Sequence, residues 1–357
     1  MGERDGGRVT LQTLADALGI SRTTASNAFN RPDQLNPALR ERVLALAAEL
    51  GYAGPDPAGR ALRSGRAGSI GVLLTERLSY AFGDPAAVST LRGLAIEAEQ
   101  AGISLALLPV PLSGGEAAAG AVNSALVDAC FVYALPEGHP SVERVLERRI
   151  PVVIADTPHV PGVPFVSIDD RAGARAAAQH LVDLGHRRLA VASLRLREDD
   201  RTGFVDPDHR DLASYRVTRE RLRGYADAIT AAGIDWDAVP VYEGRPNSRA
   251  LGAEAVSALL ALDPRPTAVL AMSDEIALGA VDGARAAGLA VPGQLSIVGF
   301  DDAPAATQRG LTTIRQPLVD KGRAAGRMLL EAIGGGMPAD VALPTELVVR
   351  GSTAAMR

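Results

Sequence analysis

The sequence predicts a small all-α head followed by a larger α/β body built on parallel sheets. Residues 9–51 hold three short helical patterns, each with an N-terminal capping residue and an apolar stripe. Beyond Ala67, apolar strand-like runs alternate with amphipathic helical segments, which is typical of parallel sheets covered by helices on both faces. The chain has 357 residues, enough for two or three domains, and 47% of them are hydrophobic, enough for a buried core.

The first two helices of the head predict a tight turn between them. Thr10 caps the first helix, and Gly19, which suits a positive φ, ends it. Ser21 caps the second helix, Arg22–Phe29, and Ile20 between the two is expected to be a buried plug. The inward-facing residues of the two helices are expected to be Leu11, Leu14, Ala15, Leu18, Ala25, Ala28 and Phe29.

The third helix begins with Asn36 as its cap and Pro37 at its first position, and it stops at Gly51. Its apolar stripe consists of Val43, Leu44, Ala47 and Leu50. Three short helices with a four-residue turn between the first two describe a helix-turn-helix unit. The alternative is a small solvated helical bundle with ordinary polar faces.

The outward face of the second helix carries side chains suited to DNA. Arg22 has the geometry for a bidentate contact to guanine and Asn27 for one to adenine. The smaller polar residues suit phosphate contacts, which position a helix without reading the sequence. The candidate DNA-binding residues of the head are Ser21, Arg22, Thr23, Thr24, Ser26, Asn27 and Asn30.

The charge distribution permits DNA binding by the head alone. Residues 1–66 contain nine Arg and seven acidic residues, a net charge of +2, and the remaining chain has a net charge of −7. No run of eighteen apolar residues and no secretory h-region is present. The single cysteine, Cys130, excludes a disulfide framework and a cysteine zinc site. We therefore expect a cytoplasmic protein without a membrane segment, metal or cofactor.

The body begins with candidate strands that alternate with helices. The expected strands are SIGVLL, ISLALLPV, ACFVYAL, PVVIAD, LAVAS, VPVYE, TAVLAM and LSIVGF. Open parallel sheets bind ligands beyond the carboxyl ends of their strands, so two such sheets facing each other would form a cleft. No phosphate loop, GxSxG elbow or HExxH motif is present, and an enzyme is not expected. Asp169 and Asp170 are expected to cap the helix that starts at Arg171, and His186 to fix a helix–strand turn.

Several long motifs, in this order, resemble the LacI/GalR family of bacterial transcription regulators, and the resemblance covers almost the whole chain. They are LQTLADALGISRTTASNAFN, ALRERVLALAAELGY, PAGRALRSGR before SIGVLL, VSIDDRAGARAAAQHLVDLGHRRLAV, TAVLAMSDEIALGA, VPGQLSIVGFDDAP and LTTIRQP. The resemblance implies a helix-turn-helix head, a hinge and a two-lobed body similar to periplasmic sugar-binding proteins. It also implies a homodimer that reads an inverted repeat in double-stranded operator DNA.

The resemblance gives the domain boundaries as a head at 1–56, a hinge at 57–66 and a body at 67–357. The three crossings between the lobes are expected near Ile168, Ile314 and Val341. One lobe then comprises 67–168 and 315–340, and the other 169–314 and 341–357.

The hinge is implied to place Leu62 as a wedge in the minor groove, with Arg60 and Arg63 near phosphates. The alternative for Leu62 is a buried contact at a domain boundary. Gly59 costs such a short helix about 1 kcal/mol relative to Ala. Asn27 and Ala25 depart from the residues that are common in the family, so the operator is not expected to be the family's commonest palindrome.

The positions that match the family's effector contacts are Asp156, Arg221, Ser273 and Asp301, with Ser79, Tyr80 and Phe82 on the opposite wall. Arg and Asp together suit a polyhydroxylated ligand, because a guanidinium donates to hydroxyls and a carboxylate accepts from them. The alternatives are helix caps or loop carboxylates for the aspartates, and a surface pair with Glu220 or Asp227 for Arg221.

The segment 195–218 fits no core element of the family and is rich in charge. It is either an ordered flap beside the cleft mouth or a surface ornament. The expected function is a sequence-specific transcription repressor controlled by a small sugar-like effector. The alternatives are a soluble sugar receptor without a DNA role, a sugar-processing enzyme, and a nucleoside or other small polar molecule as the ligand.

Overall fold

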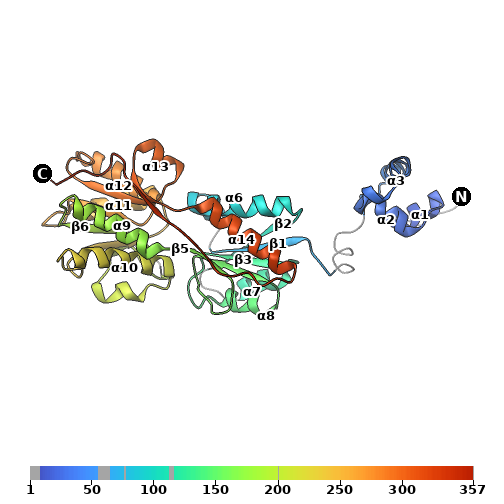
Figure 1. The fold of residues 1–357 in the computed structure, drawn as a ribbon, viewed down its shortest axis with the longest axis horizontal. Coiled ribbons are helices and arrows are strands. Elements are labelled where there is room, and N and C mark those ends of the chain that lie inside the picture. The colour runs from blue at the N-terminus through green and yellow to red at the C-terminus, as the bar shows by residue number, and fades with distance from the viewer. Residues whose placement is uncertain (1–8, 55–64, 76–77, 112–115, 200, 357) are drawn as a thin grey trace. The chain divides into compact units, whose positions relative to one another are not determined.

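The computed structural model describes residues 9–54, 65–75, 78–111, 116–199 and 201–356. Its contacts divide the chain into two units, Met1–Gly68 and Ser69–Arg357, which are treated separately below (Figure 1). The expected hinge residues Arg60, Leu62 and Arg63 lie outside the described residues.

The first unit contains the three predicted helices with the predicted caps. The Thr10 hydroxyl accepts a hydrogen bond from the Thr13 amide, and the Ser21 hydroxyl accepts one from the Thr24 amide. Gly19, which ends α1, adopts a φ of 65°. A short 3-10 turn, which was not predicted, precedes the third helix. The bounds are α1 Leu11–Leu18, α2 Arg22–Asn30, η1 Pro32–Gln34 and α3 Pro37–Glu49.

The core of this unit forms where the three helices meet. Ala25 on α2 packs against α1, and the rings of Phe29 and Tyr52 meet edge to face at 5.7 Å between centroids. Two expectations need correction. Ile20 is only partly buried, and Leu50 is exposed because α3 ends at Glu49 and leaves Leu50 as the residue that caps it.

The first lobe of the second unit is a six-stranded, fully parallel sheet with the order β12-β5-β4-β3-β1-β2. Alternate residues of each strand face opposite layers. Val72 packs toward α6 and α14, and its neighbour Leu73 packs toward α7 and α8. The elements are β1 Ser69–Thr75, α5 Leu78–Ala81, α6 Pro85–Gln100, β2 Ser104–Val110, α7 Glu116–Ser124, β3 Ala129–Tyr133, α8 Pro140–Glu147, β4 Val152–Ala155, β5 Phe165–Ile168, α14 Leu318–Ile333 and β12 Val341–Leu343.

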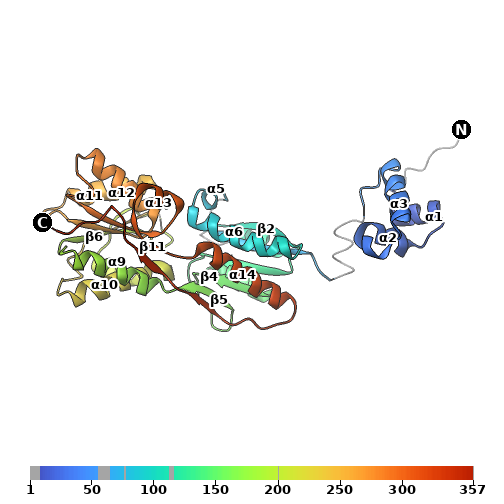
Figure 2. The same cartoon turned by 45° about the horizontal axis from the view of Figure 1, so that its top comes forward.

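The second lobe is a seven-stranded sheet with the order β13-β11-β10-β9-β6-β8-β7. Its five central strands are parallel, and the two edge strands β7 and β13 are antiparallel to their neighbours. Helices α9 and α10 cover one face, and α11 and α12 cover the other (Figure 2). The elements are α9 Asp170–Asp183, β6 Leu189–Leu194, β7 Gly203–Phe204, η2 Pro207–Leu212, α10 Arg216–Ala231, β8 Val241–Gly244, α11 Arg249–Leu260, β9 Ala268–Ala271, α12 Asp274–Ala286, β10 Ser296–Asp301, α13 Pro304–Arg309, β11 Thr312–Arg315 and β13 Glu346–Val348.

The chain crosses between the lobes three times. The first crossing follows Ile168, and the second lies between Arg315 and Leu318. The third was expected near Val341, but β12 pairs with β5 along the edge of the first sheet, so the chain crosses only after Leu343. Residues 341–343 therefore belong to the first lobe.

Glycines let paired helices approach closely in both lobes. A Cβ atom on Gly224 of α10 would collide with the carbonyl oxygen of Arg171 in α9. Gly93 of α6 faces α14 in the same way, at the carbonyl of Val319. These contacts set the spacing between α9 and α10 and between α6 and α14, and both α10 and α14 carry pocket residues.

The segment 195–218 is packed rather than free. Phe204 in β7 pairs with β8 and extends the sheet, and Arg210 is buried. The Arg210 guanidinium donates to the carbonyls of Trp236 and Val239 at 2.6 Å each and lies over the Trp236 ring. His186 fixes a helix–strand turn as predicted, because its ring nitrogens lie 3.0 Å from the hydroxyls of Thr267 and Ser296.

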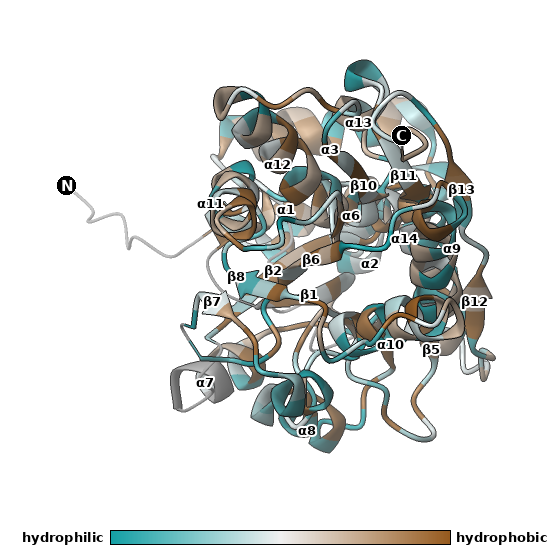
Figure 3. Cartoon of the chain, turned by 90° about the vertical axis from the view of Figure 1, so that its left-hand side faces the viewer, coloured by the Kyte–Doolittle hydropathy of each residue, from teal (hydrophilic) through white to brown (hydrophobic). Residues whose placement is uncertain are grey.

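On α8 the charged Glu143 and Glu147 are exposed while Val142 and Val145 are buried, so its ribbon has both hydrophilic and hydrophobic segments (Figure 3). Among the described residues, no helix has the length and apolar character needed to cross a bilayer.

Candidate effector pocket and DNA-reading helix

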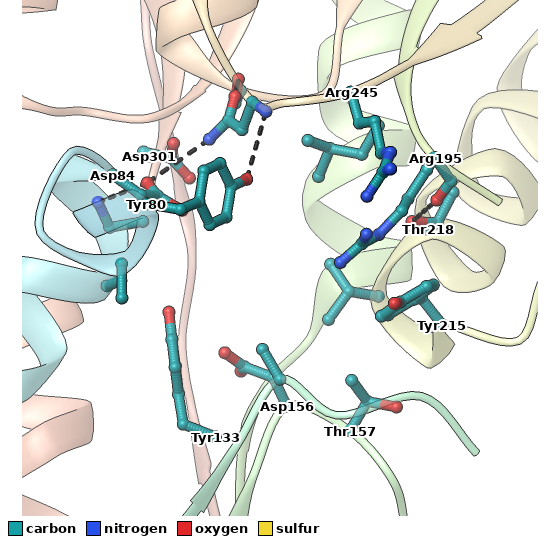
Figure 4. Close-up of a pocket in the computed structure, with 18 of the residues that line it drawn as sticks. Tyr80, Asp84, Tyr133, Asp156, Thr157, Arg195, Tyr215, Thr218, Arg245 and Asp301 are labelled. Atoms are coloured by element: carbon teal, nitrogen blue, oxygen red, sulfur yellow. Dashed lines mark hydrogen bonds between the residues drawn. The ribbon is translucent and has the colours of Figure 1, made fainter. Parts of the chain in front are cut away.

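A cavity of about 160 Å³ lies between the two lobes of the second unit (Figure 4). Its walls are formed where parallel strands end, as open α/β sheets predict. The polar and charged lining residues are Tyr80, Asp84, Tyr133, Asp156, Thr157, Arg195, Tyr215, Thr218, Arg221, Arg245, Asn247, Ser273, Asp301, Gln316 and Lys321.

Two of the predicted aspartates end strands with an unusual backbone. Asp156 follows β4 with a φ of 67°, and Asp301 ends β10 with a φ of 128°. Residues other than glycine rarely adopt such angles, and strain of this kind is concentrated at functional sites. Both aspartates line the pocket.

A chain of hydrogen bonds links Asp156 to Asp301. The ammonium group of Lys321 donates to Asp156 Oδ2 at 2.6 Å and to Gln316 Oε1 at 3.3 Å, and Gln316 donates in turn to Asp301. Asp156 is only 7% exposed, and its Oδ1 has no hydrogen-bond partner among the described residues. A buried acceptor left in this state is unfavourable until a donor reaches it.

Arg221 is buried at the pocket floor and does not pair with either expected surface partner. Its Nε donates to Asp170 Oδ1 at 2.9 Å, and its guanidinium carbon lies 3.6 Å from the centre of the Phe300 ring. Asp227 pairs with Arg171, and Glu220 pairs with Arg223. The surface alternative for Arg221 is therefore wrong.

The expectation that both Asp169 and Asp170 cap α9 is correct only for Asp169. The Asp169 carboxylate accepts the amide of Ala172 at 2.9 Å. Asp170 is instead the buried partner of Arg221. Burial raises the pKa of Asp170, and the nearby Arg221 guanidinium opposes that rise.

Behind the pocket wall, Asp301 has a second buried acid as its neighbour. Asp274, at the first turn of α12, accepts hydrogen bonds from the Thr313 hydroxyl at 2.6 Å and the Ala303 amide at 2.7 Å. Burial raises the pKa of both Asp274 and Asp301, and the charge of Asp301 raises that of Asp274 further.

The first-lobe wall is joined to the second lobe through Asn247. Its backbone amide donates to the Tyr80 hydroxyl at 3.1 Å, and its side chain reaches Asp84 at 3.4 Å. Ser273 donates to the Asn247 side chain and also caps α12 through the Ile276 amide. Residues of both lobes thus close this side of the pocket.

Ser79 and Phe82 do not line the pocket, although they were expected on this wall. Both are exposed, Phe82 at 57%. The helix α5 has only four residues and turns Tyr80 and Ala81 toward the pocket, so the side chains on either side of this pair point elsewhere.

In the first unit, the buried Ala25 and Ala28 hold the inner side of α2, which leaves the predicted side chains on its other faces. Arg22 and Thr23 are exposed, and Asn27 is partly exposed. Ser21 and Thr24 bond to each other at 2.8 Å, and Asn30 donates to Ser26 at 3.1 Å. The exposed side of α2 therefore carries polar side chains, and their contacts with DNA stay a prediction.

The comparisons with known proteins cover both units. Residues 178–353 match the model of a periplasmic binding protein-like domain. The chain is 46% identical over 349 residues to the HTH-type transcriptional regulator Rv3575c of Mycobacterium tuberculosis, with 97% of each chain covered. A solved LacI-family transcriptional regulator from Corynebacterium glutamicum is 37% identical, with a TM-score of 0.74 and 99% and 100% of the two chains covered.

The chain belongs to the LacI family of DNA-binding transcription regulators. Two further solved members are complexes with ligands. The regulator CelR in complex with cellobiose is 29% identical, with a TM-score of 0.70 over 97% of this chain and all of that one. The lac repressor dimer bound to operator and the anti-inducer ONPF is 27% identical, with a TM-score of 0.78 over 98% of this chain and all of that one.

In this LacI-family regulator, five of the seven predicted effector residues meet in one pocket: Tyr80, Asp156, Arg221, Ser273 and Asp301. Sequence reasoning missed several other lining residues. Arg195 and Arg245 directly follow strands β6 and β8, so the rule that ligands bind beyond the carboxyl ends of parallel strands would have indicated them. Lys321 carried a different signal, because it is the only lysine of the chain.

Both ends of the segment 195–218 line the pocket, through Arg195 at the start and Tyr215 and Thr218 at the end. The Thr218 hydroxyl donates to the Arg195 carbonyl at 3.2 Å and holds the two ends together. The middle of the segment extends the sheet and packs on Trp236, so the segment is ordered, and its role as a flap at the cleft mouth stays a prediction.

Proposed function

We propose that this LacI-family regulator is a repressor whose operator binding is controlled by one small polyhydroxylated molecule, a sugar of a single ring or a similar polyol. The observation that carries the proposal is Asp156 Oδ1, a buried acceptor in the inter-lobe pocket without a partner among the described residues. A ligand hydroxyl that donates to it would satisfy this oxygen.

The rest of the lining supports the same class of ligand. Carboxylates, amides and guanidinium groups converge on one cavity, and a hydroxyl both donates and accepts hydrogen bonds. The CelR–cellobiose structure gives a sugar precedent within the family. The cavity of about 160 Å³ is close to the roughly 150 Å³ that holds one benzene molecule, which favours one ring over two.

The coupling to DNA follows from the two-lobed fold. A ligand that contacts Asp156 in one lobe and Arg221 in the other stabilises one arrangement of the lobes. If two chains pair through their bodies, that arrangement biases how the paired heads meet an inverted repeat. The coupling is reciprocal, so operator DNA changes ligand affinity by the same factor. The hinge roles of Arg60, Leu62 and Arg63 remain predictions.

The test of the ligand class is a thermal-shift screen of the full chain against sugars and cyclic polyols, followed by calorimetry. A ligand at about 100 times its Kd adds about 2.7 kcal/mol of stability. We expect one compound to shift the melt and Asp156→Asn to remove the shift, whereas the exposed Asp183→Asn retains it. A compound that binds Asp156→Asn as tightly as the wild type would refute the site.

The test of the DNA-reading helix uses operators selected from random DNA in vitro. We expect an inverted repeat, and we expect Asn27→Ala to cost about 1–3 kcal/mol at one base pair of each half-site. Selected sites without two-fold symmetry would contradict the dimeric head arrangement.

A further inference from the structure

Two arginines stand side by side at the second-lobe wall of the pocket. Arg195 directly follows β6 and Arg245 directly follows β8, and the residues before them, Leu194 and Gly244, are register partners in the parallel pair. The sheet itself therefore brings the two residues together. Figure 4 shows both guanidinium groups extending toward the same part of the pocket.

Both arginines are held in place by their surroundings. Arg195 is half-buried, and its guanidinium carbon lies 4.9 Å from the centre of the Tyr215 ring. Arg245 is also half-buried and lies two residues before Asn247, which is bonded to Tyr80 and Asp84. Two guanidinium groups on one wall, with the Arg195 group held over the Tyr215 ring, suit the binding of a planar or tetrahedral anion.

The charges of the remaining lining favour a negative group on the ligand. Lys321 pairs with Asp156, and Arg221 pairs with Asp170. When Asp170 is counted with its partner Arg221 and every carboxylate is ionised, the four acids Asp84, Asp156, Asp170 and Asp301 balance the four bases Arg195, Arg221, Arg245 and Lys321. Burial raises the pKa of Asp84 and Asp301, which reduces the negative charge that they supply.

We propose that the ligand of this pocket is an acidic polyol whose phosphate or carboxylate group is bound jointly by Arg195 and Arg245. Its ring hydroxyls then face Asp156 and the first-lobe wall. This inference rests on the proposed function, because it refines the class of ligand for the same pocket. It assigns the two ends of the segment 195–218 a role in ligand selection through Arg195 and Tyr215.

The experiment compares matched neutral and acidic probes with the full-length protein by calorimetry. The probes are glucose, galactose and mannose, the 6-phosphate and the uronic acid of each, and inorganic phosphate alone. The variants are Arg195→Gln, Arg245→Gln and their combination, with the exposed Arg197→Gln of the same segment as the matched control. Ligand-free melting curves verify that each variant is folded.

We expect at least one acidic form to bind tenfold or more tightly than its neutral parent. The double variant should lose that advantage, and Arg197→Gln should keep it. Preference for the 6-phosphate identifies a phosphate ester, and preference for the uronic acid identifies a carboxylate.

Equal binding of neutral and acidic forms, unchanged in the double variant, overturns the acidic ligand and leaves the proposed polyol effector intact. Saturable binding of inorganic phosphate that the double variant abolishes, without binding of any sugar, supports the anion site and counts against the polyol. Failure of phosphate and of every acidic form to bind overturns the inference.

Discussion

Lys321 illustrates at the scale of one residue how the pocket is held together. Lys321 is 2% exposed, and its ammonium group lies 2.6 Å from Asp156 Oδ2. Taking a charge of this kind out of water is costly, and the pair is tolerated because each charge has a partner. Removing either side chain would therefore leave the other charge buried without a counter-charge.

Replacing Lys321 by Met should destabilise the body by about 3–5 kcal/mol, because it leaves a buried carboxylate without its counter-charge. Urea unfolding of the full chain measures this loss. The double variant Lys321→Met/Asp156→Asn should recover part of the stability, and a double variant as unstable as the single one would contradict the pairing argument.

Asp274 gives a pH dependence whose sign follows from its environment. Burial, with the nearby Asp301 charge, raises its pKa in the folded protein above the unfolded value of about 3.9. The folded state then binds more protons than the unfolded state in the window between the two pKa values. The free energy of unfolding contributed by Asp274 is fully present below that window and is lost as the pH rises through it.

We therefore expect the Tm of wild-type protein to fall between about pH 5 and pH 8, and to fall less in Asp274→Asn. Melting curves of both proteins across that range make the comparison. Parallel Tm profiles would mean that Asp274 does not titrate in the window.

Sequence reasoning found the residues whose hydrogen-bond partners lie a few positions away in the chain. It missed residues whose partners lie far away in the chain. The caps at Thr10 and Ser21 bond to amides three residues away, so a local pattern predicts them. The Asp170–Arg221 pair joins residues 51 positions apart and depends on the packing of α9 against α10. No local pattern contains that information.

At the scale of elements, the same distinction separates the strands that could be predicted from those that could not. The eight expected runs are apolar and long enough to be recognised as strands from the sequence, and each contains a strand. Five strands were not predicted, and all are short: the edge strands β7, β12 and β13 have two or three residues each, and β5 and β11, which lie next to β12 and β13, have four each. The third crossing was misplaced because β12 is one of these short strands.

The helix pair α9–α10 positions Arg221, and Gly224 sets the distance between the two helices. Gly224→Ala should push α10 away from Arg171 and displace Arg221 from Asp170. We expect a loss of about 1–3 kcal/mol in stability from overpacking, together with weaker ligand binding. Calorimetry and urea unfolding measure the two effects.

Gly326→Ala is the matched control, because its Cβ would crowd Glu97 at the contact of α14 with α6, away from the pocket lining. It should lower stability without changing ligand affinity. Equal loss of affinity in both variants would show that general destabilisation, rather than the position of Arg221, is responsible.

At the scale of the whole body, contacts between the lobes flank the pocket on two sides. On one side, Asn247 of the second lobe bonds to Tyr80 and Asp84. On the other, Arg219 of α10 holds the Glu137 carboxylate with two bonds of 2.7 and 3.0 Å. The Glu137 amide also donates to the Ser214 carbonyl at 2.9 Å. These contacts join the two lobes in the arrangement that the structure describes.

Glu137→Gln should weaken ligand binding without touching the pocket, because it removes charge from a contact that joins the two lobes. The Glu137 side chain is 39% exposed, so solvent screens the pair and the effect should be at most about fivefold in Kd, which corresponds to about 1 kcal/mol. Calorimetry measures it, with Glu147→Gln on α8 as the control. An unchanged Kd would mean that the Glu137–Arg219 pair does not favour the lobe arrangement that binds the ligand.

Because the only lysine is buried, the rate of cleavage at Lys321 can report how often this part of the body opens. A protease that cuts after lysine has a single target in the chain, the bond after Lys321, and the first turn of α14 shields it. Cutting requires that this part of the body open, and it produces just two fragments, residues 1–321 and 322–357. The rate at which they appear follows the population of opened molecules when opening and closing are fast relative to cleavage. A compound that holds the lobes together would slow that rate, so a gel with two bands can rank ligands without any label.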